Sequence, residues 1–286
     1  MKKLLEILTN EQGHWVGDGF PVRSLFSYNG NTEVRSPFLL LDYAGPWNFE
    51  PNANQPRGVG QHPHRGFETV TIVYEGEVSH RDSSGNGGTI GPGEVQWMTA
   101  ASGILHEEFH SDAYSKKGGP FRMVQLWVNL PAKDKSAPAG YQAISRGTIP
   151  QVEMKGGAAR VIAGQLNGVN GPAKTFTPIN LWNVLLEAGA EVSLPLPNGH
   201  NSMIVVITGN VVIDGKHLGE AEIARLSTEG ECTTVRANES AMLLVMSGEP
   251  IREPVVAYGP FVMNSEAQIR QAIEDFNRGT FGLIAR

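Results

Sequence analysis

The chain has 286 residues, 40% hydrophobic and 18% charged, which is typical of a soluble globular protein with one large or two ordinary domains. A net charge of −6 and the lack of any long Lys/Arg run argue against direct nucleic-acid binding. The single cysteine, Cys232, excludes an internal disulfide, and no apolar run is long enough for a membrane span. The start MKKLLEILTN meets Glu6 before any long apolar core and does not resemble a secretory signal, so we expect a cytoplasmic protein.

Short β-rich runs separated by turn residues follow one another through the first half. The run ETVTIVYEG (68–76) has the β-branched and aromatic residues of a strand. The run SSGNGGTIGPGEVQWMTA (83–100) predicts a turn followed by strands, and FRMVQLWVNLP (121–131) predicts a strand that ends at its proline. Strands at this spacing, with no helical stripe between them, indicate a sandwich or barrel.

A Pro-, Ala- and Lys-rich stretch, NLPAKDKSAPAGYQ (129–142), lacks periodicity and is interpreted as the connection between two halves. We therefore predict an N-terminal domain at 1–133 that binds metal and a C-terminal domain at 134–286 that lacks metal ligands. The stretch SEAQIRQAIEDFNRG (265–279) begins with a serine N-cap, has an apolar face and ends in glycine. It predicts a short C-terminal amphipathic helix.

The second half repeats the strand pattern of the first. When Gly209 is laid on Gly76, the run MIVVITGNVVI (203–213) matches TVTIVYEGEVS (69–79). In this register His62, His64 and Glu68 fall on Pro195, Pro197 and Asn201. The repeat keeps a strand–turn–strand frame and loses the ligands, which predicts two similar β domains.

The histidines of the first half form the main candidate site. Residues two apart on a strand point to the same side, so His62 and His64 can reach one ion, and so can His106 and Glu108. Glu68 shares the parity of His64 if that strand continues, which leaves the carboxylate open on spacing alone. Imidazole and carboxylate suit Fe, Cu, Ni, Mn or Zn, and three or four protein ligands leave open positions on the metal.

The alternative to a metal site is that these are ordinary surface or hydrogen-bonded histidines, since isolated His-x-His pairs arise by chance. The second pair of residues and the β context favour the metal site. His110 shares the parity of His106, and we expect it either to contact the metal site or to contact one of the metal ligands.

These residues resemble the pirin family of the cupin superfamily. The first cupin motif corresponds to His62, His64, Glu68 and Gly76, with one more residue between Glu68 and Gly76 than the general pattern, as in pirins. The second corresponds to the run Gly103-Ile104-Leu105-His106. The segments VGDGFPVRSLF, HPHRGFETV, GEVQWMTAASGILHEE, QLWVNLP and EPVVAYGPFVMNSEAQIRQAI are also similar, so the resemblance spans about residues 13–278.

The resemblance implies an all-β bicupin, with two stacked antiparallel β-barrel or jelly-roll domains, a short C-terminal helix and metal in the N-terminal domain only. It implies that the metal ligands are His62, His64, His106 and Glu108, with Fe(II) as the expected metal and Cu, Ni, Mn or Zn as alternatives. It also implies a monomer. Ordinary cupins use the glutamate of the first motif, so Glu68 remains an alternative ligand or a group behind the ligands.

The resemblance further implies quercetin 2,3-dioxygenase activity, in which a flavonol ring is opened with dioxygen and carbon monoxide is released. Glu108 is the candidate for the group that takes the substrate proton, and Glu68 or Glu107 is expected to support it from outside the ligand set. Five residues are predicted either to line an aromatic pocket or to pack in the core: Phe67, Trp97, Met98, Phe121 and Met123.

Two alternatives to the enzyme stay open at this point. Some pirins resemble redox-sensitive regulators, in which the oxidation state of the metal changes a surface that binds a transcription factor or a metabolic enzyme. A purely structural metal is the third interpretation, although an open ligand set favours catalysis or sensing over a closed structural site.

Overall fold

The computed structural model describes residues 1–284 and divides into two compact units. We call one the C-terminal unit, made of Met1–Glu11, Glu33–Pro37 and Gly147–Pro250. The other is the N-terminal unit, made of Gln12–Thr32, Phe38–Arg146 and the chain from Ile251 onward. Each end of the chain thus folds with the unit that is built mainly from the opposite half. Residues on both sides of the predicted boundary between 133 and 134 belong to the N-terminal unit, which includes Phe38–Arg146. The division into domains at 1–133 and 134–286 stays a prediction.

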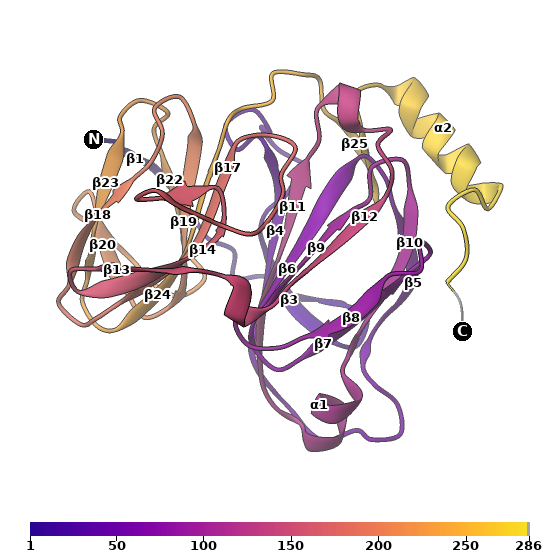
Figure 1. Cartoon of the computed structure of the whole chain (residues 1–286), viewed down its shortest axis with the longest axis horizontal. Helices are drawn as coiled ribbons and strands as arrows, with labels where there is room; N and C mark the ends of the chain where they lie inside the picture. Colours follow the sequence, from indigo (N-terminus) through magenta and orange to yellow (C-terminus); the bar gives the residue numbers. More distant parts are fainter. Residues whose placement is uncertain (285–286) are drawn as a thin grey trace. The chain divides into compact units, whose positions relative to one another are not determined.

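The N-terminal unit is built from two antiparallel sheets. The first has the order β12 (Gly140–Ile144), β9 (Val95–Thr99), β6 (Phe67–Glu75), β11 (Gly119–Asn129), β4 (Phe38–Phe49), β3 (Phe20–Phe26) and β2 (His14–Val16). The second has the order β5 (Gly58–His64), β10 (Ile104–His110), β7 (Val78–Asp82) and β8 (Gly87–Ile90). Within this unit, Figure 1 shows the strands of the second sheet lying across from β6 and β9. A short helix α1 (Asp112–Lys117) follows β10.

The strands predicted in the first half are all present, but the predicted connection is partly a strand. Its last residues belong to β12, which pairs with β9 from Gly140 opposite Thr99 to Ile144 opposite Val95. A single turn of 3-10 helix at Ala132–Asp134 fills the earlier part. The Pro-rich composition predicts irregular backbone, yet edge pairing with β9 gives the last three of these residues, 140–142, a hydrogen-bonded partner strand.

A sharp corner separates β5 from β6. The corner residue Gly66 has φ +91°, and a Cβ atom there would lie 1.9 Å from the carbonyl oxygen of Val262. The buried Lys135 ammonium stabilises this corner by donating hydrogen bonds to the carbonyls of Gly66 and Val262 and to Oδ1 of Asn129. The strand that begins at Gly58 therefore does not continue into Glu68, and the parity expected between His64 and Glu68 is wrong.

Strand β6 has two different faces. Phe67, Thr69 and Thr71 alternate on the face toward the second sheet, where the Thr71 hydroxyl lies 3.3 Å from Glu108. We call this the inner face. Glu68 lies on the other face, where its carboxylate accepts a hydrogen bond of 2.7 Å from the Thr99 hydroxyl. The Glu68 side chain is 1% exposed, and burial raises its pKa to about 7.

The C-terminal unit repeats the two-sheet arrangement. One sheet has the order β1 (Leu4–Leu8), β22 (Ile223–Leu226), β19 (Asn201–Thr208), β24 (Ala241–Gly248), β17 (Ile179–Leu186), β14 (Gly157–Ala163) and β13 (Gln151–Met154). The other has the order β18 (Glu191–Pro195), β23 (Cys232–Ala237), β20 (Val211–Ile213) and β21 (Lys216–Leu218). A small hairpin, β15 (Gln165–Leu166) and β16 (Val169–Asn170), extends from β14.

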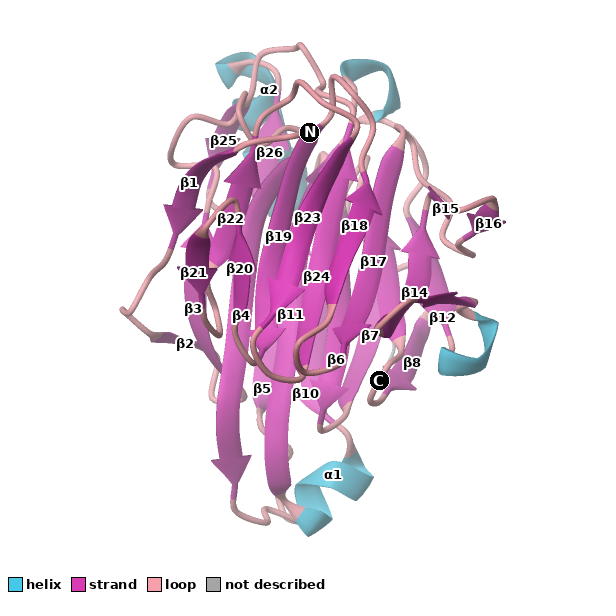
Figure 2. Ribbon diagram, turned by 90° about the vertical axis from the view of Figure 1, so that its left-hand side faces the viewer, coloured by secondary structure: helices cyan, strands magenta, loops and turns pink. Residues whose placement is uncertain are grey.

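The repeat inferred from the sequence matches the backbone. Gly209 and Gly76 both have positive φ, 80° and 84°, after β19 and β6 respectively. The interior of the C-terminal unit is a large apolar cluster that includes Trp182, Leu194 and Leu243. Figure 2 shows that strands make up most of the chain, with helix confined to short segments.

The predicted C-terminal helix is confirmed as α2 (Glu266–Asn277). Ser265 caps it by accepting a hydrogen bond from the Gln268 amide, and Ile269 and Ala272 are buried. They pack on a hairpin of β25 (Val256–Tyr258) and β26 (Phe261–Met263) in the N-terminal unit. Within residues 1–284, no helix has both the length and the apolar composition that crossing a bilayer requires.

The buried Glu68 predicts a specific pH dependence of stability. The folded protein keeps the Glu68 proton up to a pH of about 7, whereas an unfolded chain releases it near the ordinary value of 4.5. The free energy of unfolding should therefore fall as the pH rises from about 4.5 to about 7, and level off above that. Glu68→Gln should remove about 3 kcal/mol of this fall and be more stable than the wild type at pH 8.

Urea unfolding between pH 4.5 and pH 8 measures this effect. Glutamine still offers an oxygen to the Thr99 hydroxyl, so the variant changes mainly the charge. Parallel pH profiles for wild type and variant would contradict the assignment.

Candidate metal centre

Three histidines from neighbouring strands converge on one point in the N-terminal unit. His62 and His64 lie on β5, and His106 lies on β10 directly opposite His62 in the antiparallel register. The ring centroids are 4.2 Å apart for His62 and His106 and 4.8 Å apart for His64 and His106. One ring nitrogen from each residue lies within 4.8 Å of the other two. The His-x-His spacing therefore places three imidazoles together, as the sequence predicted.

Each of these rings keeps a nitrogen that could bind a metal. The Nδ1 atom of His62 donates to the carbonyl of Gly60 at 2.8 Å, which leaves Nε2 with its lone pair. Nδ1 of His64 and Nε2 of His106 are buried and have no hydrogen-bond partner. Buried polar atoms without partners are rare in native proteins, and a cation is the partner that suits an imidazole lone pair.

Burial also sets the protonation of the histidines. The pKa values of His64 and His106 lie well below the ordinary value, first because burial disfavours the charged ring and then because neighbouring histidines repel a second charge. Both rings are thus neutral at physiological pH. Neutral imidazole is the form that ligates metals, so no proton has to be displaced.

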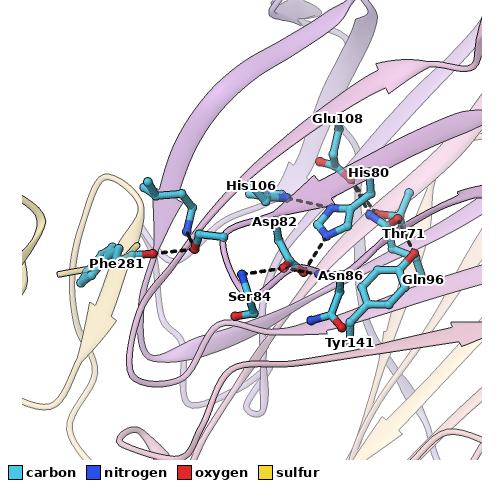
Figure 3. A network of polar contacts seen from close by, with 12 residues as sticks. Thr71, His80, Asp82, Ser84, Asn86, Gln96, His106, Glu108, Tyr141 and Phe281 are labelled. Carbon is cyan, nitrogen blue, oxygen red and sulfur yellow. Dashed lines mark hydrogen bonds and ion pairs between the residues drawn. The ribbon is translucent and has the colours of Figure 1, made fainter. Parts of the chain in front are cut away.

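A pair of residues on β7 fixes the orientation of His106 (Figure 3). Nε2 of His80 lies 3.1 Å from the carboxylate of Asp82, and Nδ1 of His80 lies 3.3 Å from Nδ1 of His106. A carboxylate only accepts, so Nε2 of His80 donates to Asp82, and Nδ1 of His80 is placed to accept from Nδ1 of His106. That tautomer leaves the lone pair of His106 on Nε2. Burial alone would raise the pKa of Asp82, but hydrogen bonds from His80 and from the Asn86 and Ser84 amides lower it overall.

The carboxylate of Glu108 is held by neutral donors from the facing sheet. One oxygen accepts from Nε2 of Gln96 at 2.7 Å, and the other accepts from Nε2 of Gln125 at 3.0 Å. Figure 3 shows His80 between Glu108 and Tyr141. The Tyr141 ring stacks on the His80 ring at 4.9 Å, with 8° between the planes. These contacts hold Glu108 with its oxygens inside the unit.

The structure divides the four predicted ligands between two groups that could hold a metal. The first is His62, His64 and His106, and the second is His80, His106 and Glu108. The pairing of β10 explains this, because against β5 His106 lies opposite His62, whereas Glu108 lies opposite Val59, which has no ligand atom. Against β7 the pairing is regular, and Glu108 lies directly opposite His80. His106 is common to both groups.

His80 and Asp82 were not predicted as site residues. The signal in the sequence is weak but present, because the two are separated by one residue in a β-rich run and therefore share a face. Which face they share depends on the register of β7 against β10, and spacing along one strand does not give that register.

Three other predicted residues lie away from the histidines. Glu68 is on the outer face of β6, as described above. Glu107 points out of the sheet to an ion pair of 2.6 Å with Arg81, beside a groove of about 700 Å³ that Phe109 also lines. His110 donates from Nε2 to the carbonyl of Gly19. These positions correct the expectation that the three residues stand behind the ligands.

The distance of His110 from the site has a packing cause. Its ring lies 4.5 Å from that of Phe49 and 5.0 Å from that of Phe121, so aromatic side chains fill the interior at this level of β10. Shared parity with His106 was correct but did not bring the two rings together.

Of the predicted pocket residues, Phe67 lies directly beside a candidate ligand. Its ring lies 5.1 Å from that of His64 and is stacked on Trp127 at 4.2 Å. Trp127 was not predicted, although it also lies 5.1 Å from His64. The other predicted residues are packed in the interior: Met98 with Ile104, and Phe121 and Met123 in a separate apolar cluster. Trp97 is fully buried and alternates with Met98, so it faces the opposite side of β9 from Met98.

The sequence matches two family models. Residues 19–128 match the model described as pirin, and residues 181–282 match the pirin C-terminal cupin domain. Together the two models cover most of the chain and both of its cupin repeats.

Known proteins are similar over nearly the whole chain. A Pseudomonas aeruginosa protein, provisionally named as a quercetin 2,3-dioxygenase, is 56% identical over 98% of this chain and 99% of its own. A crystal structure of quercetin 2,3-dioxygenase from Acinetobacter baumannii is 52% identical, with a TM-score of 0.96 and full coverage of both chains. The Escherichia coli pirin YhhW, solved in complex with nickel(II), shares the fold at 22% identity and a TM-score of 0.68, over 86% of this chain and 99% of its own. The chain belongs to the pirin family and is an all-β protein with two cupin domains and a short C-terminal helix.

Proposed function

We propose that the protein is a metal-dependent dioxygenase of the quercetin 2,3-dioxygenase type. In this reaction one dioxygen is incorporated into a flavonol, the ring opens and one carbon monoxide leaves. The observation that carries the proposal is the set of three imidazoles with free nitrogens beside a buried carboxylate. The names of the Pseudomonas and Acinetobacter relatives support the choice of substrate class.

His62, His64 and His106 are the proposed nitrogen ligands, with Glu108 as the oxygen ligand next to His106. The donor set fits a divalent transition metal, since His64 and His106 keep unpartnered nitrogens and burial lowers the pKa of both rings. Fe(II) is the metal we expect, and Cu, Ni, Mn and Zn suit the same donors. A bound metal supplies Lewis acidity that favours the ionised form of the flavonol 3-hydroxyl and an open position for substrate.

Glu108 is the proposed acceptor of the proton from the flavonol hydroxyl. Its carboxylate is a hydrogen-bond acceptor, and the amides of Gln96 and Gln125 fix both of its oxygens. The amides have no proton of their own to transfer, so they orient the base without competing with it. His80 and Asp82 keep His106 in the orientation that presents Nε2.

The aromatic side chains beside His64 are proposed to receive the flat rings of the substrate. Phe67 and Trp127 both contact the His64 ring, and His62 is only partly buried. The site is therefore apolar on one side of the ligands and accessible near His62. Exclusion of water from this apolar side strengthens the electrostatic interactions at the reacting atoms.

Replacement of a nitrogen ligand should abolish both metal binding and turnover. His62→Ala and His106→Ala each remove one imidazole, and we expect loss of bound metal by elemental analysis after gel filtration. The fold should persist, because burial of the two apolar interiors provides its stability. Circular dichroism checks this point, and His217→Ala, an exposed histidine of the C-terminal unit, is the matched control. Full activity of either ligand variant would rule out the proposed site.

Replacement of the proposed base should separate chemistry from metal binding. Glu108→Gln keeps a side chain of the same shape, so we expect part of the metal to be retained while kcat falls by about 100-fold or more. Glu107→Gln is the control, since Glu107 points away to Arg81 and its replacement should leave kcat near the wild-type value. An unchanged rate for Glu108→Gln would assign the proton transfer to another group.

The activity itself is tested by quercetin turnover under air after reconstitution with Fe(II), Mn, Cu, Ni or Zn in turn. Metal-dependent loss of the flavonol absorbance together with release of carbon monoxide is the expected result. Stoichiometric metal without turnover in all five cases would overturn the dioxygenase assignment.

A further inference from the structure

The inner face of the first sheet contains two rows of side chains across from the candidate ligands. In the first row Gln125 pairs with Thr71, and both have contacts with Glu108. In the second row Trp127 pairs with Thr69. Trp127 contacts His64, as does Phe67, the residue that precedes Thr69 on the same face of β6. The second row therefore lies level with the histidines, next to the row that holds the carboxylate.

The polar atoms of the second row have no partners. The Thr69 side chain is fully buried, and its hydroxyl makes no hydrogen bond. Nε1 of Trp127 is also buried and unpartnered. Phe67 and Tyr28 both stack on the Trp127 ring, at 27° and 22° to its plane. Stacking engages an aromatic ring through its face, so these two contacts leave the N–H on the edge of the indole without a partner.

Two adjacent unpartnered groups at this place indicate a ligand rather than a packing defect. A buried polar group without a hydrogen bond is unfavourable, and native structures contain few of them. The indole of Trp182 in the C-terminal unit also lacks a partner, but it lies in an apolar cluster. Thr69 and Trp127 instead lie in the row between Phe67, which contacts His64, and the pair of Thr71 and Gln125, which contacts Glu108.

We propose that Thr69 and Trp127 form a hydrogen-bonding subsite for an oxygen of the substrate, next to the oxygen that binds the metal. The inference rests on the proposed function and deepens it. An indole N–H only donates and a hydroxyl can donate, so the group they recognise is an acceptor such as a carbonyl or phenolate oxygen. The ligand class that presents such an acceptor beside a metal-binding hydroxyl is an aromatic 3-hydroxy-4-ketone. The two residues thus determine specificity for the keto group, and they leave proton transfer to Glu108.

The test uses Thr69→Val, which replaces a hydroxyl with a methyl of similar size, and Trp127→Phe, which keeps an aromatic ring and removes the N–H. The nickel-loaded proteins are titrated without oxygen by calorimetry with quercetin and with maltol, a small ring that carries only the hydroxy-ketone. Each variant should bind both probes about fivefold to tenfold more weakly, the loss expected for one hydrogen bond. Metal content should be unchanged. Thr69→Val should not lower the Tm of the metal-free protein, because its hydroxyl has no partner to lose.

Thr99→Val is the matched control, since Thr99 is a buried threonine of the same sheet whose hydroxyl donates to Glu68. It should lower the Tm and leave both dissociation constants unchanged, the opposite of the Thr69 result. Wild-type affinity in Thr69→Val and Trp127→Phe would overturn the subsite, and so would a wild-type protein that holds nickel but binds neither probe. Binding of maltol that depends on the two residues, without quercetin turnover by any metal form, would support the subsite while the dioxygenase assignment fails.

Discussion

The candidate site depends on the alternation of side chains along β10. His106 and Glu108 point inward, and Glu107 between them points outward to Arg81. Pairing with β5 brings His62 opposite His106, and pairing with β7 brings His80 opposite Glu108. One strand thus joins a nitrogen-rich group on one side to a carboxylate-containing group on the other. A shift of the β10 register by one residue would exchange the inward and outward sets and remove both groups.

Amide and imidazole donors make this polar interior compatible with burial. Amides of Gln96 and Gln125 hold the Glu108 carboxylate, and Asp82 is held by the His80 ring and by two backbone amides. These contacts replace the water that each carboxylate loses, without a lysine or arginine that would repel a bound cation. The interior therefore presents negative and lone-pair-bearing atoms together, which is the electrostatic requirement of a divalent metal.

The sequence predicted the parts of the site that depend on spacing within one strand. The shared face of His62 and His64, and that of His106 and Glu108, follow from the period of two in a β-strand. The expectation for Glu68 failed where a backbone irregularity decides the outcome, because the corner at Gly66 reverses its parity. The surroundings of Glu108 depend on a neighbouring strand, since pairing with β7 places it directly opposite His80. Registers between strands are long-range properties, and no spacing along one strand contains them.

The two cupin repeats show what the same frame does with different side chains. In the C-terminal unit Pro195 and Pro197, which align with His62 and His64 in the sequence repeat, are exposed, and apolar side chains such as Leu194 and Ile204 fill the interior. In the N-terminal unit the interior keeps histidines, carboxylates, amides and the unpartnered Thr69 hydroxyl. An apolar interior would be the more favourable filling for stability alone. The polar interior of the N-terminal unit instead suits the proposed metal and the ligand beside it, which would give partners to atoms that the protein leaves without them.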